Sequence, residues 1–355
     1  MNTRLKVALL FGGRSGEHEV SLRSAASVAE GLAARHEVLP VLVCKAGGWL
    51  LQEGATPRPA GGEPVFLAPT PQDGGRLRRL SDARELARPD VYFPVLHGTY
   101  GEDGTVQGLF ELAGVPYVGA GVAASAASMD KAIMKSLFAQ AGLPQVEHRV
   151  LTRRDAGSEA RLVDELGLPV FVKPANLGSS VAVSKVKTRE ALAPALALAF
   201  SYDRKVVVER GHDVREIEVG VLGNDEPAAS LPGEILPDRE FYDYDSKYAA
   251  DSRTELVIPA RIDAALTAAV QSLGTAAFRA VDAAGFARVD CFLERASGRL
   301  LLNEINTIPG FTSIRMYPKL WQASGVSYPD LLARLVTLGI ERHQARERLS
   351  THYGG

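Results

Sequence analysis

The sequence predicts a protein of two to three domains, at about 150 residues per domain, that begins as an open parallel α/β sheet and continues as α+β structure. Three short apolar runs, at 6–11, 37–43 and 91–96, are predicted strands, and an alanine-rich stretch at 22–34 is a predicted helix. Strands that alternate with helices form parallel sheets. After about residue 125, short β-type runs follow one another across glycine and proline turns, which is typical of α+β domains.

Local signals define the remaining elements. Residues 47–88 are rich in Gly, Pro and Arg without a sustained period, so we expect long loops with short strands there. Pro94 has no amide hydrogen, which places its strand at a sheet edge or a bulge. A helix over 128–141 has Asp130 near its start and Gly142 after its end. The other predicted elements are strands at 170–173, 181–186, 206–209 and 216–222, helices at 189–199, 263–283 and 328–342, and a hairpin of strands 287–293 and 299–304.

Composition excludes several classes of function. Lys and Arg number 40 against 42 Asp and Glu, so the chain lacks the basic excess of a nucleic-acid binder. Two cysteines, Cys44 and Cys291, are far apart in the sequence and form neither a disulfide framework nor a metal-type cluster. No apolar run reaches the roughly 18 residues of a membrane span, and no signal-peptide pattern precedes the first strand. We therefore expect a cytoplasmic protein without membrane or nucleic-acid partners.

The hairpin near residues 287–304 carries a strong chemical signal. Residues two apart in a strand share a face, so Arg288 and Asp290 point together. Glu304 and Asn306 do the same on the next strand, and the tight turn between the strands places Glu304 opposite Asp290 to within one residue. Two carboxylates and an amide oxygen on one face suit a hard divalent cation. Because the flanking residues are apolar, unpaired carboxylates would be costly there, which favours a metal site over a solvated face.

Two lysines indicate an anion-binding site. Lys173 ends an apolar strand, where a lysine is costly unless an anion pairs with it. The segment of Gly178, Ser179 and Ser180 that follows can fold over phosphates and donate backbone N–H groups and hydroxyls. Lys131 stands at a helix start, and by itself it would be an ordinary exposed lysine.

Three loops complete the predicted site. Segments 12–21 and 97–104 follow strands at the end where open α/β sheets bind ligands. Glu17 in the first could pair with a substrate ammonium group, and His97 in the second could move a proton or bind a carboxylate, although lone residues of this kind more often belong to an ordinary surface. The tyrosine-rich stretch 241–251 fits a mobile lid that carries Lys247 to a transferring phosphate.

Two common nucleotide-binding patterns are missing from the sequence. No GxxxxGKS/T segment occurs, which excludes a P-loop. The early glycine turn lacks the GxGxxG spacing of a dinucleotide fold, so a dehydrogenase is a distant alternative.

Seven motifs, in this order, carry a resemblance to a known family: GGRSGEHEVSL, HGTYGEDG, MDK, KPANLGSS, YDSKY, RVD and NEINTIPGFT. From Val7 to about Leu338 the chain resembles ATP-grasp enzymes, and more narrowly D-alanine–D-alanine ligases. The resemblance implies a homodimer that uses ATP and two Mg²⁺ or Mn²⁺ ions. It also implies a three-domain ATP-grasp architecture, with a substrate domain at 1–125, a central domain at 126–215, and a catalytic domain at 216–355 with a mobile loop at 241–253.

The resemblance further assigns roles to individual residues. ATP would phosphorylate the carboxylate of one D-alanine, and the amine of a second would attack the acyl phosphate. The groups implied to bind ATP are Lys131, Lys173, Ser180, Glu209, Glu216 and Lys247. The implied metal ligands are Asp290, Glu304 and Asn306. The other implied active-site groups are Glu17, Ser179 and Tyr248 at the first ammonium group and Arg288 and the Gly310 N–H at the oxyanion, with His97 as a further catalytic candidate.

Two positions bear on the choice of substrate. Tyr248 stands where relatives that accept D-lactate usually carry another residue, which favours dipeptide formation. Arg315 stands where the family commonly has a serine that binds the second carboxylate, and an arginine could bind that group bidentately or point away. The alternatives are a D-alanine–D-lactate or D-alanine–D-serine ligase, or a silent ATP-binding protein. The last is disfavoured because both lysines and every implied metal ligand are present.

Overall fold

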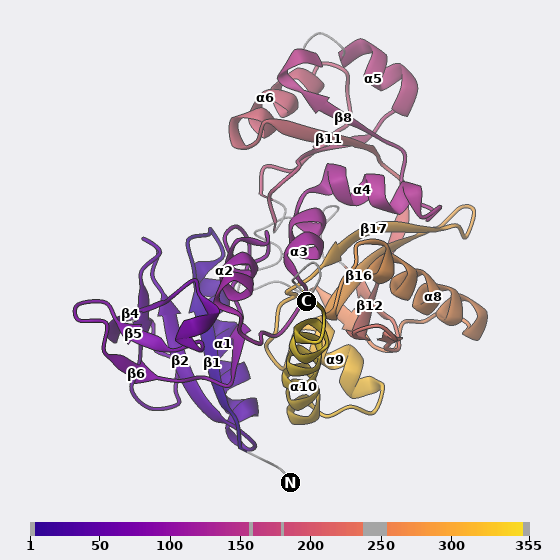
Figure 1. The fold of residues 1–355 in the computed structure, drawn as a ribbon. Coiled ribbons are helices and arrows are strands. Elements are labelled where there is room, and N and C mark those ends of the chain that lie inside the picture. Colours follow the sequence, from indigo (N-terminus) through magenta and orange to yellow (C-terminus); the bar gives the residue numbers. More distant parts are fainter. Residues whose placement is uncertain (1–3, 156–158, 179–180, 237–253, 351–355) are drawn as a thin grey trace.

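Three β-sheets of seven, four and six strands organise the chain (Figure 1). The computed structural model describes residues 4–155, 159–178, 181–236 and 254–350. In Figure 1 the first sheet lies at the lower left, the second at the top and the third at the right. Within the described ranges, every helix is too short or too polar to cross a membrane.

The N-terminal sheet is built around buried parallel strands. β1 (Lys6–Gly12) pairs in parallel with β2 (Glu37–Val43) and β7 (Val91–Pro94), and α1 (His18–Ala33) connects β1 to β2. These strands are nearly continuous apolar runs because both faces are covered. β7 is an edge strand and Pro94 is its last residue, so the prediction from this proline is confirmed.

The rest of that sheet is antiparallel, so the sheet is mixed rather than wholly parallel. Residues 47–88 were expected to form loops with short strands. They add four strands to the sheet beyond β2, because short connections allow hairpins but not parallel crossovers. The elements are β3 (Trp49–Leu51), β4 (Glu63–Leu67), η1 (Pro71–Asp73), β5 (Leu77–Arg79) and β6 (Glu85–Ala87).

A break at Asp130 corrects the helix predicted over 128–141. After α2 (Thr105–Ala113), the chain forms α3 (Val122–Met129) and α4 (Lys131–Gln140) as separate helices. Asp130 has extended dihedrals, and its Oδ1 accepts hydrogen bonds from the N–H groups of Ala132 and Ile133 at 3.1 and 3.2 Å. An aspartate that caps a helix in this way stabilises a new start. Lys131 therefore begins α4, where its N–H donates to the carbonyl of Ala175 at 2.9 Å.

The central sheet separates an apolar face from a polar face. Its order is β10 (Ser184–Val186), β9 (Val170–Pro174), β11 (Lys205–Arg210) and β8 (His148–Thr152), all antiparallel. After η2 (Arg153–Asp155), α5 (Glu159–Leu166) and α6 (Leu192–Tyr202) form an apolar core with one face. Because strand side chains alternate, Lys173 and Glu209 lie on the other face, against which α4 packs.

The C-terminal sheet is antiparallel and contains the predicted hairpin, which is confirmed. Its order is β15 (Glu255–Val257), β14 (Gly233–Leu236), β12 (Val214–Gly223), β16 (Gly285–Glu294) and β17 (Leu300–Asn306), and β13 (Ala228–Ala229) also pairs with β12. The helix α8 (Ala264–Ala280) packs on this sheet and shares its apolar core.

The last two helices pack the C-terminal part of the chain against the N-terminal sheet. α9 (Met316–Ala323) and α10 (Tyr328–Glu347) contribute to one core with the N-terminal sheet, and α10 packs on α1. The hydroxyl of Tyr328 donates to the carbonyl of Phe311 at 2.7 Å. This bond ties the segment between β17 and α9 to α10, and the ring of Phe311 also packs against Phe93 of β7.

Candidate active site

A cavity of about 500 Å³ gathers most of the predicted site residues. Its lining draws on the N-terminal, central and C-terminal sheets and on the loops that follow their strands. The predicted residues that line it are Glu17, His97, Lys131, Lys173, Glu216, Arg288, Asp290, Glu304, Asn306, Gly310 and Arg315. Four other predicted residues, Ser179, Ser180, Lys247 and Tyr248, lie outside the described residues, as does the predicted loop 241–253.

Glu17 lies where loops from two different parts of the chain meet. It follows β1, and its loop is tied to the loop after β7 because the Ser15 hydroxyl donates to the carbonyl of His97 at 2.6 Å. A Cβ at Gly98 would lie 2.9 Å from Oε2 of Glu17, and one at Gly178 would lie 3.1 Å away. Side chains at these two positions would displace the carboxylate, so the glycines permit its placement in the cavity.

His97 anchors the neighbouring loop. Its side chain is 4% exposed, Nδ1 lies 3.0 Å from the carbonyl of Ile308, and Nε2 lies 3.1 Å from the Ser24 hydroxyl. A carbonyl only accepts, so Nδ1 carries the hydrogen and Nε2 accepts from Ser24. Burial lowers the pKa of His97, against the charge of Glu17. Both nitrogens of a neutral ring are thus engaged, which supports an anchoring role more than proton transfer.

Glu102 is a site residue that the sequence reasoning missed. It lines the cavity and accepts a hydrogen bond from the N–H of Gly98 at 2.7 Å. Burial, reinforced by Glu17, raises the pKa of the Glu102 carboxyl well above its ordinary value, and the N–H groups of Gly98 and Ile308 oppose this. His97 thus binds the C=O of Ile308, and Glu102 accepts a hydrogen bond from the N–H of the same residue. Ile308 lies two residues before Gly310. The motif HGTYGEDG contained this glutamate, but its sequence did not indicate which acid faces the cavity.

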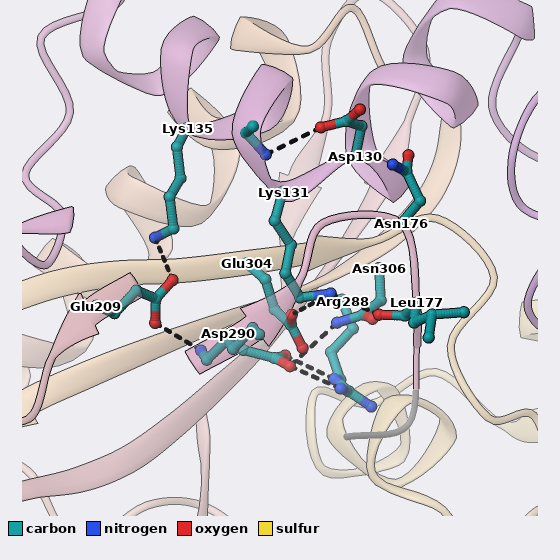
Figure 2. Close-up of polar contacts among 12 residues, drawn as sticks. Asp130, Lys131, Lys135, Asn176, Leu177, Glu209, Arg288, Asp290, Glu304 and Asn306 are labelled. Carbon is teal, nitrogen blue, oxygen red and sulfur yellow. Dashed lines mark hydrogen bonds and ion pairs between the residues drawn. The ribbon is translucent and has the colours of Figure 1, made fainter. Parts of the chain in front are cut away.

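The two predicted phosphate lysines line the cavity from different elements, Lys131 from α4 (Figure 2) and Lys173 from β9. Lys131 Nζ donates to the carbonyl of Leu177 at 2.7 Å and lies 3.9 Å from Oε2 of Glu304. Lys173 Nζ lies 2.6 Å from Oε2 of Glu209. Both lysine side chains are mostly buried, 13% and 14% exposed. Their charges are therefore held at the cavity wall in a partly desolvated setting, where electrostatic attraction is strong.

Glu209 lies behind the wall rather than in it. Its carboxylate bridges Lys173 and Lys135, whose Nζ is 2.9 Å from Oε1. Burial opposes the charge, but the two lysines outweigh it and hold the pKa of Glu209 well below its ordinary value. The predicted contact of Glu209 with adenine or ribose stays a prediction, as does that of Glu216, which lines the cavity. Lys135 was missed, because a helix lysine is by itself an ordinary surface residue.

The acidic wall is formed by the predicted hairpin. Asp290 pairs with Glu304 and Arg288 with Asn306 across β16 and β17, and a bulge follows Asp290. This register confirms the sequence prediction. Arg288 binds both oxygens of Asp290, at 2.6 and 2.7 Å, and the Asn306 amide donates to Oδ2 of Asp290 at 3.0 Å. Arg288 also lies 3.1 Å from Oε2 of Glu218, a further acid of the cavity that sequence reasoning missed.

The donor set on this wall fits a divalent cation that is shared with a phosphate. Among the described residues, no three His, Cys, Asp or Glu side chains are grouped closely enough to hold a metal by themselves. Asp290 and Glu304 offer carboxylates, and Asn306 offers an amide oxygen. Mg²⁺ usually binds one or two protein carboxylates together with waters and substrate phosphates, and the facing lysines mark a place for those phosphates.

Comparison with known proteins gives one consistent result. Residues 6–120 match the family model described as D-ala D-ala ligase N-terminus, and residues 137–337 match the D-ala D-ala ligase C-terminus. The D-alanine–D-alanine ligase of Heliobacterium modesticaldum is 52% identical, covering 97% of each chain. D-alanine–D-alanine ligase A of Bradyrhizobium diazoefficiens is 49% identical, covering 99% of this chain and 100% of the other.

Solved structures agree with the sequence matches. The D-alanine–D-alanine ligase of Coxiella burnetii superposes with a TM-score of 0.83 at 37% identity, covering 97% of this chain and 98% of the other. The VanG D-Ala:D-Ser ligase of Enterococcus faecalis gives 0.84 at 34% identity, covering 95% and 100%. Because ligases with different second substrates superpose equally well, the backbone fold does not determine which second substrate is used.

Proposed function

The chain belongs to the D-alanine–D-alanine ligase family, and we propose that it joins two D-alanines at the cavity described above, converting ATP to ADP and phosphate. It has the ATP-grasp fold and is an ATP-dependent ligase whose dipeptide serves peptidoglycan synthesis. The observation that carries the proposed site is the cavity itself, where two lysines face two carboxylates and an amide from the hairpin, with Glu17 at another wall.

The first step would be phosphoryl transfer to the carboxylate of the first D-alanine. Such transfers depend mainly on positioning and on neutralising phosphate charge. We propose that Lys131 and Lys173 contact the ATP phosphates, and that Asp290, Glu304 and Asn306 hold two Mg²⁺ or Mn²⁺ ions. The ions would neutralise charge on the transferred phosphate when bound. The hydrogen bond of Lys131 to Leu177 and the ion pair of Lys173 with Glu209 support this role, because they fix the positions of both ammonium groups.

The second step would be attack by the amine of the second D-alanine. Glu17 would orient the ammonium group of the first substrate, together with Ser179 and Tyr248. Arg288 and the N–H of Gly310 would stabilise the oxyanion of the tetrahedral intermediate before phosphate leaves. Arg288 uses Nε and one Nη on Asp290, and a guanidinium has five N–H donors, so further donors remain for an oxyanion.

The remaining ATP contacts and the domain boundaries are also proposals. Ser180 and Lys247 would contact phosphates, and Glu209 and Glu216 would contact adenine and ribose. We propose domains at 1–125, 126–215 and 216–355. Within the last, a lid at 241–253 would exclude water from the acyl phosphate.

Two further properties are proposed from the family resemblance. We place the reaction in the cytoplasm, where ATP is available, and expect a homodimer. Sedimentation at working concentration would test the dimer, and a monomer that retains full ligation activity would contradict it.

Arg315 is the proposed contact for the carboxylate of the second substrate. It lines the cavity, and a Cβ at Gly310 would lie 3.5 Å from its Cγ, so its side chain starts beside the proposed oxyanion donor. If Arg315 binds this carboxylate, Arg315→Met, which removes every side-chain donor, should raise the KM of the second D-alanine by about tenfold or more, since a charge-assisted hydrogen bond would be lost. An unchanged KM would place the side chain outside this subsite.

The test of the function is phosphate release, with the product identified by mass spectrometry. D-alanine alone should give one phosphate for each D-alanyl-D-alanine, and L-alanine should give none. Parallel reactions that contain D-alanine with D-lactate or with D-serine test the choice of second substrate. Absence of dipeptide from D-alanine alone, or a clear preference for a mixed product at neutral pH, would overturn the proposal.

A further inference from the structure

We propose that Lys135 is a positioning residue that acts through Glu209: by pairing with this carboxylate it leaves a net positive charge on the buried group, and this charge lets Lys173 attract the phosphates of ATP. The proposal rests on the function proposed above, in which Lys173 contacts those phosphates. Lys135 itself does not line the cavity, so it can act on ATP only through other residues.

The three side chains form one continuous chain of ion pairs, and Figure 2 shows the pair of Lys135 with Glu209. Lys135 lies one turn after Lys131 on α4, and residues four apart share a helix face. Its Nζ is 2.9 Å from Oε1 of Glu209, and Oε2 of Glu209 is 2.6 Å from Nζ of Lys173. Each carboxylate oxygen thus has its own lysine, which restricts rotation of Glu209 and fixes Lys173.

Burial explains why Lys173 is the member of this group that meets a ligand. Lys135 is 1% exposed and Glu209 is 2% exposed, whereas the Lys173 side chain is 14% exposed and lines the cavity. Lys135 and Glu209 therefore influence the cavity through the position of the Lys173 ammonium and through the charge of the group.

The charge of the group is the reason for a second lysine. Glu209 and Lys173 by themselves would form a neutral pair. Lys135 is therefore not needed to neutralise Glu209. With Lys135 the three groups carry one net positive charge in a buried setting, where charges interact strongly. Three buried side chains that together carry one net positive charge are suited to a phosphate. Burial opposes the charge on Lys173, but Glu209, Glu304 and Glu216 outweigh it and raise the pKa of the lysine.

The test separates phosphate attraction from general damage to the site. Dissociation constants for ATP with Mg²⁺ and for adenosine are measured by competition. The adenosine constant divided by the ATP constant reports how much the phosphates contribute to binding. In Lys135→Met the group becomes neutral, so this ratio should fall by about tenfold or more. In the double variant Lys135→Met/Glu209→Gln the net positive charge returns, and the ratio should recover most of that loss. Lys6→Met, at the exposed start of β1, is the control for losing one lysine and should leave the ratio unchanged.

A purely structural role for Lys135 predicts a different pattern. It would weaken ATP and adenosine alike, or leave the double variant no better than the single one, and either result overturns the proposal. A wild-type protein that binds ATP no better than adenosine would overturn both this proposal and the proposed function. Normal ATP preference in Lys135→Met would overturn only the present one. Thermal melting checks folding, and if the Met variant does not fold, Lys135→Gln, which also lacks the charge, carries the same prediction.

Discussion

The basic wall of the cavity, formed by Lys131 and Lys173, and its acidic wall, formed by Asp290, Glu304 and Asn306, have their counter-ions in different places. On the basic wall, Lys173 is paired with Glu209, which lies behind it and away from the cavity. On the acidic wall, Asp290 is paired with Arg288, which is two residues away on the same strand and lines the same cavity. A phosphate can therefore meet Lys173 without displacing Glu209 from it, whereas a cation at Asp290 must compete with Arg288. Lys173 on the basic wall is therefore already held in place before a ligand binds, whereas Asp290 on the acidic wall must exchange Arg288 for a cation.

The largest expected effect comes from the counter-ion that lies inside the cavity. Arg288→Ala should reduce kcat for ligation by about 100- to 1000-fold, because it removes a proposed oxyanion donor and leaves Asp290 without its bidentate partner. Steady-state phosphate release measures this. Arg295→Ala is the matched control, since Arg295 is exposed and pairs with Asp213 at 3.2 Å outside the cavity. Ligation at the wild-type rate in Arg288→Ala would remove this residue from the mechanism.

The basic wall should respond in affinity for ATP. Lys173→Met removes the ligand-facing charge and leaves Glu209 paired with Lys135, so the site should remain folded. We expect the KM of ATP to rise by about 30-fold or more, as when one member of a buried charge pair is truncated. Lys185→Met, on the adjacent strand β10 and outside the cavity lining, should change it by less than about twofold. Equal effects of the two substitutions would contradict a special role for Lys173.

The acidic wall should respond in its requirement for metal. Asp290→Asn keeps the shape of the side chain but removes its charge, so the Mg²⁺ concentration for half-maximal activity should rise by about tenfold or more. Removing divalent ions with a chelator should abolish activity in wild type, and added Mg²⁺ should restore it. The exposed acid Asp213, changed to Asn, is the control. An unchanged Mg²⁺ requirement in Asp290→Asn would place the metal elsewhere.

The last expected effect is on stability rather than on ligation, and it is the acid sensitivity of the basic wall. The pKa of Glu209 is lower in the folded protein than its ordinary value of 4.5, so its contribution to stability is full above that value and is lost as the pH falls below it. We expect this contribution to be about 2 kcal/mol. Urea unfolding of wild type and Glu209→Gln over a series of pH values measures it. The two stability curves should converge as the pH falls, and parallel curves would show that Glu209 does not carry the acid sensitivity.

Local patterns predicted the elements whose signals lie within a few residues. The strand predicted at 37–43 has those bounds in the structure, and the one at 6–11 is extended by a single residue. The alternation rule placed Asp290 opposite Glu304, because a tight turn leaves little freedom of register. Such predictions succeed because hydrogen bonding and side-chain direction in a hairpin depend on near neighbours.

The errors arose where one local signal had two meanings. Asp130 was taken for a residue near the start of one helix, but it ends α3 and caps α4. The helix predicted from residue 22 begins at His18, because the polar residues before it belong both to the first turn and to the substrate loop. α2, α5 and α9 were not predicted. In the case of α9, the segment after Gly310 had been assigned to the substrate site.

The sequence by itself determined the family resemblance, the candidate phosphate lysines and the hairpin that presents Asp290 and Glu304, because these depend on residue types at short spacings. Only the tertiary structure decided that Glu209 lies between two lysines, that Glu102 and His97 hold Ile308, and that α10 packs on α1. These contacts join residues tens to hundreds of positions apart. Which polar groups are buried together depends on how whole sheets and helices pack, and no short-range periodicity carries that information.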